Sequence, residues 1–312
     1  MDDLVFYFEG IPSAIIVPST IFNFQKGKIA INGPLGVAYA NPEDDLAFQK
    51  ALSEAGSLVP GEVDEVLQVK GLLANPETSR TVSYLLCSAK KCGDVIEDLK
   101  ALAKSKVLVA GCGGIGSSLS MLLAGAGIKN FLLVDADIIE KSNLNRQLFW
   151  TLNDVGNKKV DVLKSALESR FEGLNIDVLD RTSSIEDLCE LASSDITAAA
   201  VTADNPATLA RESWKISESC KIPVVSGGYL HHICLSFDFL PEEHRYLKEK
   251  DTESESEEWL RLPSAIMPSY GPMNFSLASQ LSANLISSIA KCTFGLKSTS
   301  VNSWDSRSLS KV

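Results

Sequence analysis

The sequence predicts an α/β protein: a doubly wound, mostly parallel sheet with a small α+β module before it. Two observations predict the sheet. Short apolar runs alternate with amphipathic helical patterns from about residue 76 to 235, and a glycine-rich turn joins the first run to the first helix. The module is predicted by residues 1–75, where short apolar runs are broken by Gly and Pro. We therefore expect two domains, 1–75 and 76–312.

The N-terminal module is expected to hold three strands and a helix. The strands are predicted by the β-type composition of residues 4–8, 13–17 and 28–33. Residues 41–56 have helical periodicity, and Pro42 with the acidic residues at 43–45 marks the start of that helix. Pattern alone does not show what this acidic module does.

In the second region, strand patterns and helical patterns alternate along the chain. Strand patterns occur at 106–111, 130–137, 175–180, 196–203 and 222–230, and helical patterns at 115–127, 158–171, 183–193 and 205–220. Such crossovers cover both faces of a parallel sheet. A final helix is predicted at 276–291. Between these parts, the acidic run "EKDTESESEEW" has the composition of a solvated crossover loop near 245–260.

Bulk composition narrows the possible functions. A net charge of -11 leaves no basic excess for nucleic-acid phosphates, so a nucleic-acid partner is not expected. No apolar run approaches the roughly 20 residues that span a bilayer, and the N-terminus lacks the basic start of a signal peptide. We therefore expect a cytoplasmic protein without a membrane partner. The seven cysteines show no Cys-x-x-Cys spacing, so they are expected to be reduced thiols without a four-cysteine zinc site.

A glycine-rich loop predicts a nucleotide site. The glycines lie where the first strand of the sheet turns into a helix, and they allow backbone N–H groups and the helix N-terminus to approach a phosphate. They are Gly111, Gly113, Gly114 and Gly116. Asp135 follows about 20 residues later at the end of the next strand, where a carboxylate accepts ribose hydroxyls. These features predict an adenine nucleotide but do not separate NAD from ATP.

Polar residues after the strands favour ATP. Asn143 and Arg146 lie in "SNLNRQ", Lys159 opens a helix, and Asp204 follows the strand at 196–203. Residues just past the carboxyl ends of parallel strands converge on one crevice. Arg and Lys there could hold a triphosphate, and Asp204 could hold Mg²⁺. A nicotinamide-dependent oxidoreductase shares the glycine loop and Asp135 but gives these residues no role.

The motifs "GCGGIG", "DADIIEKSNLNRQLF", "DVGNKKVDV" and "VTADN" resemble the adenylating domain of the ubiquitin-activating-enzyme superfamily. Its bacterial members include ThiF-type adenylyltransferases of the thiamine and molybdopterin pathways and microcin-type (MccB) peptide-activating enzymes. The resemblance covers roughly residues 78–235. It implies an ATP- and Mg²⁺-dependent enzyme that activates carboxylates, and it implies a homodimer.

The resemblance also implies roles for individual residues. Asp135 would hold the ribose, with Asp137 beside it, and Asn143, Arg146 and Gln147 would lie near the phosphates. Lys159 would neutralise the triphosphate as pyrophosphate leaves. Asp204 would bind Mg²⁺. Arg80, placed by spacing alone, would reach the ATP of the partner subunit.

Two departures from the family pattern limit what carries over. The family's paired Cys-x-x-Cys zinc site is absent, and Cys234 is a weak candidate nucleophile that is more typical of a core thiol. Among polar residues near the crevice, His231 or His232 could be a general base and Tyr229 could line the substrate channel, but structural roles explain them equally well.

Residues 48–66 resemble part of the winged-helix peptide clamp of peptide-modifying relatives, which binds a leader peptide as an added strand. A plain packing or dimerisation module is the alternative. The implied substrate is a ribosomal precursor peptide whose carboxylates, glutamate side chains among them, are activated for internal cyclisation, with phosphorylation as an alternative to adenylation. Other functions left open are microcin-like adenylation of a peptide C-terminus, sulfur-carrier adenylation, NAD-dependent oxidation, and a non-catalytic scaffold.

Overall fold

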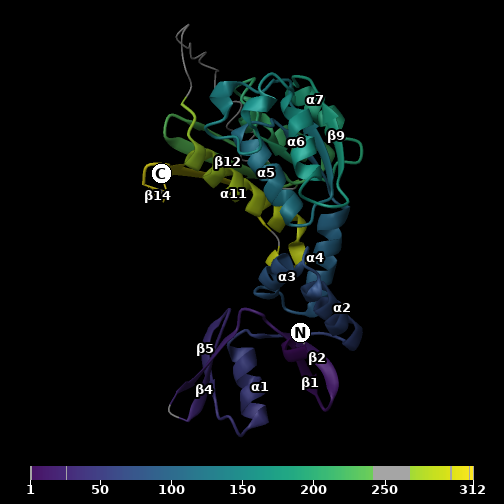
Figure 1. Cartoon of the computed structure of the whole chain (residues 1–312), viewed down its shortest axis with the longest axis vertical. Coiled ribbons are helices and arrows are strands. Elements are labelled where there is room, and N and C mark those ends of the chain that lie inside the picture. Colours follow the sequence, from purple (N-terminus) through teal and green to yellow (C-terminus); the bar gives the residue numbers. More distant parts are fainter. Residues whose placement is uncertain (1, 26, 242–267, 296, 309, 312) are drawn as a thin grey trace. The chain divides into compact units, whose positions relative to one another are not determined.

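Figure 1 presents the computed structural model, which describes every residue except 1, 26, 242–267, 296, 309 and 312. The chain divides into two compact units. The first comprises residues 1–101 and 290–295, and the second comprises 102–289 and 296–312. The acidic run expected as a crossover loop near 245–260 lies outside the described residues. The boundary expected at residue 75 falls in the turn between two helices of the first unit.

The first unit contains two small antiparallel sheets within the described residues. They have the strand orders β1-β2-β6 and β3-β4-β5. A 3-10 turn, Asp2–Leu4, precedes them. The strands are β1 (Val5–Phe8), β2 (Ile11–Ile16), β3 (Ile21–Gln25), β4 (Lys28–Gly33), β5 (Gly36–Ala40) and β6 (Leu58–Pro60).

Each sheet of the first unit is covered by helices. The helices are α1 (Asp45–Glu54), α2 (Val63–Ala74), α3 (Ser79–Leu86), α4 (Cys92–Lys104) and α12 (Lys291–Phe294). Leu52 of α1 joins Ile31 of β4 in one core, while α2, α3 and α4 share a second core with Ile15 of β2. As the sequence predicts, α1 begins among acidic residues, and its cap Asp44 accepts the N–H of Ala47 at 2.9 Å.

The segment 290–295 is fastened to the first unit by a buried carboxylate. Asp98 of α4 is 1% exposed and accepts the backbone N–H of Cys292 at 3.0 Å and of Thr293 at 2.7 Å. These two bonds satisfy N–H groups at the start of α12 that have no partner within the helix. They join residues that lie 194 and 195 positions apart in the chain.

The second unit is built on an eight-stranded sheet, counted within the described residues, in the order β14-β13-β12-β11-β10-β7-β8-β9. Strands β9, β8, β7, β10 and β11 run parallel, and β12, β13 and β14 extend the sheet antiparallel. The strands are β7 (Lys106–Ala110), β8 (Asn130–Val134), β9 (Asn175–Leu179), β10 (Ala198–Val201), β11 (Val224–Leu230), β12 (Ile233–Phe239), β13 (Ser300–Asp305) and β14 (Ser310–Lys311).

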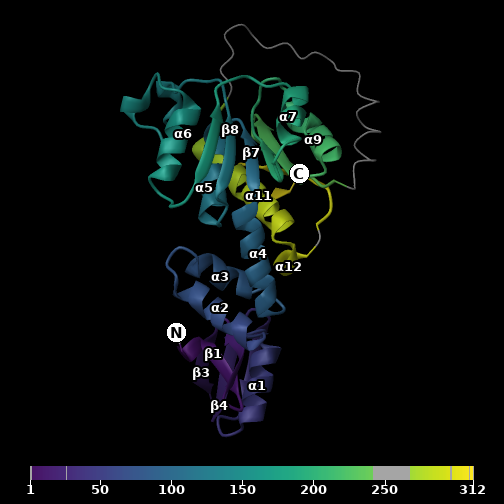
Figure 2. The same cartoon turned by 90° about the vertical axis from the view of Figure 1, so that its right-hand side faces the viewer.

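Helices cover both faces of the parallel strands, which confirms the predicted doubly wound α/β fold. Figure 2 shows α5 and α6 on one side of β7 and β8, and α7 and α9 on the other. The helices are α5 (Gly114–Gly125), α6 (Lys159–Glu168), α7 (Ile185–Ala192), α8 (Leu209–Glu212), α9 (Trp214–Cys220) and α11 (Gly271–Ile289). Short 3-10 turns occur at Lys141–Asn143 and Leu152–Asp154.

The first unit contains strands β3, β5 and β6 and helices α2, α3 and α4 beyond those predicted. In the second unit the structure corrects the predicted elements in three places. The single helix predicted at 205–220 is broken at Ser213, whose hydroxyl donates to the Leu209 carbonyl at 2.7 Å, a bond of the kind that bends helices. The last helix begins at Gly271 rather than 276, because Pro272 is tolerated in a first turn. Strands β12, β13 and β14 have no counterpart among the predicted strands.

None of the helices in the described parts of the chain is both long and apolar enough to cross a bilayer.

Candidate functional site

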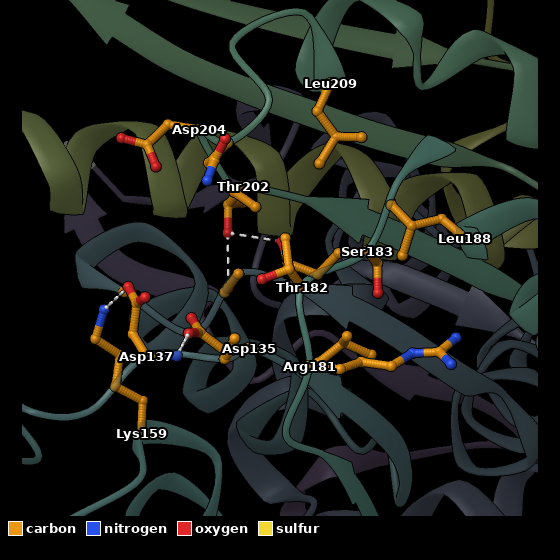
Figure 3. A pocket seen from close by; sticks show the side chains of 17 residues that line it. Asp135, Asp137, Lys159, Arg181, Thr182, Ser183, Leu188, Thr202, Asp204 and Leu209 are labelled. Atoms are coloured by element: carbon orange, nitrogen blue, oxygen red, sulfur yellow. Dashed lines mark hydrogen bonds and ion pairs between the residues drawn. The ribbon is translucent and has the colours of Figure 1, made fainter. Parts of the chain in front are cut away.

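A pocket opens where the carboxyl ends of β7, β8 and β10 meet (Figure 3). From β7 the chain continues to β8 on one side, whereas β10 pairs with β7 on the other. Such a switch in strand order leaves a crevice where ligands of doubly wound sheets bind. The pocket brings together six residues that the sequence singled out: Gly111, Gly113, Asp135, Asp137, Lys159 and Asp204.

The glycine loop is packed too tightly for side chains at two positions. Gly111 has φ +92, and a Cβ there would lie 2.4 Å from the backbone nitrogen of Ala203. A Cβ at Gly116 would lie 1.8 Å from the Gly111 carbonyl oxygen. The loop is therefore pressed against the end of β10, where the Thr202 hydroxyl donates to the Gly111 carbonyl at 2.8 Å.

The N-terminus of α5 is left open by Gly113. Gly113 is the N-cap residue, and no side chain caps the helix there. A Cβ on it would meet only the Gln147 amide nitrogen, at 3.7 Å. Because the first N–H groups of a helix point outward along a positive dipole, this end of α5 suits an anionic group.

Asp135 is held rigidly at the base of the pocket. One carboxylate oxygen accepts the backbone N–H of Cys112 at 2.6 Å, and the other accepts that of Asp137 at 2.8 Å. Burial raises the pKa of Asp135, while the nearby Lys159 ammonium opposes the rise. Each oxygen keeps a free acceptor site, so the group can receive two hydroxyls of a ribose.

Lys159 is the first residue of α6 and is 7% exposed. Its backbone N–H donates to the Asp137 carbonyl at 3.0 Å, and its ammonium lies 2.6 Å from a carboxylate oxygen of Asp137. The Asp137 side chain is 69% exposed, so the ion pair faces solvent at the pocket. A phosphate group that enters the pocket would pair with the Lys159 ammonium, either together with Asp137 or in place of it.

Asn143, Arg146 and Gln147 do not line the pocket, but Arg146 and Gln147 lie near its glycine loop. Asn143 is buried, and its side-chain oxygen accepts the N–H of Glu140 at 3.0 Å. Gln147 is buried and accepts the indole N–H of Trp150. Arg146 Cγ would lie 3.2 Å from a Cβ on Gly114, and its Nη1 donates to the Ser142 carbonyl at 3.0 Å. Arg146 and Gln147 therefore lie beside the N-terminus of α5.

Asp204 lines the pocket, whereas Arg80 belongs to the first unit. Asp204 is an exposed carboxylate at the mouth of the pocket, on the same side as Asp137 in Figure 3. Arg80 lies on α3 of the first unit and is exposed. The structure brings Asp204 to the site and leaves the predicted role of Arg80 a prediction.

Further pocket residues were absent from the sequence-based set. They include Arg181, Thr182, Ser183, Leu188, Asn205 and Leu209. The segment 181–183 follows the carboxyl end of β9, so the rule that placed Asp135 after β8 could also have found it. Leu188 and Leu209 belong to the buried core that packs on this face of the sheet. They give one end of the pocket an apolar wall.

The remaining sequence candidates lie elsewhere. His231 is exposed at the tip of the β11–β12 hairpin with φ +55, and it does not line the pocket. Cys234 is buried in β12, where burial raises the pKa of its thiol to about 11, as expected for a core thiol. The Tyr229 hydroxyl lies 2.5 Å from that of Ser269. No cluster of three His, Cys, Asp or Glu side chains suited to a metal occurs among the described residues.

The donor set fits a nucleoside triphosphate with its magnesium ion. The apolar wall can take a base and the fixed carboxylate a ribose, while the open end of α5 and the Lys159 ammonium can take phosphates. Asp204 offers the exposed oxygen ligand that Mg²⁺ prefers. The ThiF family matches residues 92–309, more than half of the chain.

The chain belongs to the ThiF family.

One curated relative is the adenylyltransferase and sulfurtransferase MOCS3 of Aedes aegypti, 38% identical over 133 residues, which are 41% of this chain and 29% of that protein. The chain spans only 13–29% of the length of the curated relatives that it matches. Among solved structures with a similar fold, E. coli MccB with AMPCPP and MccA has a TM-score of 0.73 at 19% identity, and the match covers 96% of each chain. PaaA has a TM-score of 0.65 at 19% identity and covers 94% of this chain and 97% of its own.

Proposed function

We propose that this chain uses ATP to adenylate a carboxylate of a ribosomally made precursor peptide. The observation that carries the proposal is the pocket itself, which combines a fixed carboxylate, a buried ammonium and an uncapped helix end at the switch point of the sheet. Family membership supports adenylation, and E. coli MccB, which shares the fold, has been crystallised with ATP. The MccB likeness covers both units, which supports a peptide substrate.

During the reaction, negative charge builds up on the phosphate oxygens, and positively charged and N–H groups of the chain stabilise it. The substrate carboxylate oxygen bonds to the α-phosphorus, and the bond from that phosphorus to the departing pyrophosphate oxygen breaks. Asp135 fixes the ribose so that the α-phosphorus lies near the N-terminus of α5. Lys159 receives charge that builds on the leaving pyrophosphate, and Arg146 has further N–H donors for the same purpose. Mg²⁺ held by Asp204 would add charge neutralisation at the phosphates.

The first unit would hold the peptide. Strands β3 and β5 each pair only with β4 among the described residues, so their outer edges can accept an added strand. On β3, Ile21 and Phe24 are 64% and 74% exposed, which offers apolar contacts to a peptide lying along that edge. We propose β3 as the edge that binds the leader of the precursor.

The activated group would be a glutamate side chain that cyclises within the peptide, because attack by a nucleophile of the peptide itself needs no reactive cysteine on the enzyme. The solved structure of PaaA shares this fold over nearly the whole chain. A sulfur-carrier adenylyltransferase is the second candidate, and the 38% identity to the adenylyltransferase and sulfurtransferase MOCS3 over 133 residues supports it. It differs in needing a protein tail, not a short peptide, as the acceptor.

The first test measures ATP–pyrophosphate exchange in the presence of a small peptide encoded beside this chain. Lys159→Ala should lower exchange by about 100-fold or more, since it removes the charge that stabilises the leaving pyrophosphate. Lys158→Ala is the matched control: this neighbouring lysine is half exposed, pairs with Asp180 at 2.5 Å and does not line the pocket. It should change exchange less than about twofold. Equal losses in both variants would remove Lys159 from the site.

The product distinguishes the finer alternatives. Intact mass spectrometry of the peptide after incubation with the chain, ATP and Mg²⁺ should show loss of water, with or without carbon dioxide. A stable gain of AMP would replace cyclisation by nucleotide transfer. An unchanged peptide with no ATP consumption would contradict the enzyme proposal and favour a scaffold. Protection against melting by NAD but not by ATP would favour an oxidoreductase.

A further inference from the structure

The apolar end of the pocket contains a buried hydroxyl that has no partner among the residues that the structure describes. Ser183 is 8% exposed, and its Oγ makes no hydrogen bond within that part of the chain. The residue follows β9 and directly precedes Ser184, the N-cap of α7, whose own hydroxyl accepts the N–H of Asp187. The Ser184 hydroxyl therefore caps α7, whereas the Ser183 hydroxyl makes no such structural bond among the described residues.

The position of Ser183 sets it apart from other unpaired hydroxyls. Five more buried side-chain hydroxyls lack a partner in the described part of the chain: Thr20, Ser57, Ser117, Ser236 and Thr293. None of these lines the pocket, whereas Ser183 does. Buried polar groups are normally paired, because an unmade hydrogen bond is costly away from water. An unpaired hydroxyl at a ligand pocket therefore indicates a bond that forms when the ligand binds.

The surroundings of Ser183 indicate which part of a ligand it meets. Figure 3 shows it beside Leu188, on the side of the pocket away from Lys159 and Asp137. Leu188 and Leu209 are almost fully buried and present hydrocarbon to this end. With Asp135 between the two ends as the ribose ligand, the phosphates lie toward Lys159 and the base lies toward Leu188.

We infer that the Ser183 hydroxyl hydrogen-bonds to the edge of the adenine base and adds to the affinity for ATP. The inference rests on the proposed function, because it takes ATP as the ligand of the pocket. A serine hydroxyl can donate to a ring nitrogen or accept from the exocyclic amino group. The flat base, lying against Leu188 and Leu209, presents both kinds of group at its edge.

Calorimetric titration of ATP into the wild-type chain, Ser183→Ala and Ser236→Ala, without peptide, tests the assignment. Ser236 is the matched control, because it is a fully buried serine on β12 whose hydroxyl is also unpaired but does not line the pocket. Loss of one hydrogen bond to the base should weaken ATP binding by about 3- to 10-fold in Ser183→Ala. Ser236→Ala should bind ATP within about twofold of wild type.

Two further measurements separate a base contact from a structural effect. Inorganic triphosphate, which has no base, should bind equally to wild type and Ser183→Ala. The melting temperature of unliganded Ser183→Ala should not fall, because the hydroxyl has no bond to lose. Weaker triphosphate binding, or a lowered melting temperature, would overturn the inference in favour of a structural role for Ser183.

Purine riboside 5′-triphosphate, which lacks the exocyclic amino group, identifies the atom on the base. Equal binding of this analogue to wild type and Ser183→Ala would assign the contact to the amino group, and a persisting difference would assign it to a ring nitrogen. Equal ATP affinity in wild type and Ser183→Ala would overturn the inference and leave the proposed function intact. No ATP binding by the wild-type chain would refute the proposed function instead.

Discussion

The carboxyl group of Asp135 couples nucleotide binding to pH. Burial raises its pKa above the ordinary value of 3.8, so it takes up a proton at a higher pH than an exposed aspartate. A carboxyl whose pKa is raised in the folded chain favours folding at pH values below its unfolded pKa. This contribution to the stability of the fold is lost as the pH rises through the folded pKa. For ligand binding the sign is opposite, because a ribose needs the charged acceptor.

We therefore expect ATP affinity to fall on acidification, by about tenfold per pH unit once the pH is below the raised pKa of Asp135. Calorimetric titrations of ATP from pH 7.5 downward would measure the slope. Asp135→Asn supplies the control, since its binding should already be weak at neutral pH and should stay flat over the same range. The same slope in both proteins would assign the pH effect to another group.

Single residues also show what the sequence could and could not predict. The glycine loop, Asp135, Lys159 and Asp204 share a pocket because each lies at a strand or helix end, which is visible as pattern. The buried packing of Asn143 and Gln147 depends on Glu140 and Trp150, and no periodicity reveals such contacts. Ser183 was missed because a serine before a helix is most simply explained as part of a cap.

At the scale of elements, the turn from β7 into α5 is limited by close packing at some glycines and not at others. Gly116→Ala should destabilise the fold by about 3 kcal/mol, because its Cβ would overlap the Gly111 carbonyl oxygen at 1.8 Å. Gly113→Ala places its Cβ in ordinary contact, 3.7 Å from the Gln147 amide, so it should cost less than about 1 kcal/mol. Urea unfolding of both variants would measure the difference. Equal stability would show that the α5 turn relaxes freely.

The open edge of β3 gives a second prediction at this scale. Phe24→Ser should raise the KM for the precursor peptide about tenfold without changing the affinity for ATP, because it removes an apolar contact to the added strand. Leu46→Ser on α1 is the control, since Leu46 is 73% exposed and Phe24 is 74% exposed in the same unit. Peptide titrations of the exchange reaction would compare them. Equal KM values for Phe24→Ser and Leu46→Ser would show that the peptide does not bind along β3.

Strand prediction succeeded where apolar runs lie between helices and failed at the antiparallel end of the sheet. Strands β7 to β11 are short apolar runs, and four of them are buried through most of their length. Strand β13 reads "SVNSWD" and is mostly half-buried, and it is held by pairing with β12 along six residues. Its position comes from a partner distant in sequence, which local patterning cannot supply.

For the whole molecule, the proposed homodimer makes a prediction about Arg80. If Arg80 acts on the ATP of a partner subunit, Arg80→Ala and Lys159→Ala should each be inactive alone but complement one another when mixed. Half of the dimers would be hybrids with one intact site of two, which gives about a quarter of wild-type exchange. Exchange activity after mixing and subunit exchange would measure this. Absence of recovery would place Arg80 on the ATP of its own chain or outside the reaction.

The two-unit division has a consequence for biosynthesis. The first unit is complete only when α12 has left the ribosome, because the carboxylate of Asp98 is paired by backbone groups 194 and 195 residues later. At about 5–20 residues per second, this delay lasts roughly 10–40 seconds. During that interval the carboxylate of Asp98 lacks the two backbone donors that pair with it in the folded chain. We therefore expect that nascent chains stalled before residue 290 are bound by chaperones and cut by proteases in the first unit more readily than chains stalled after residue 295.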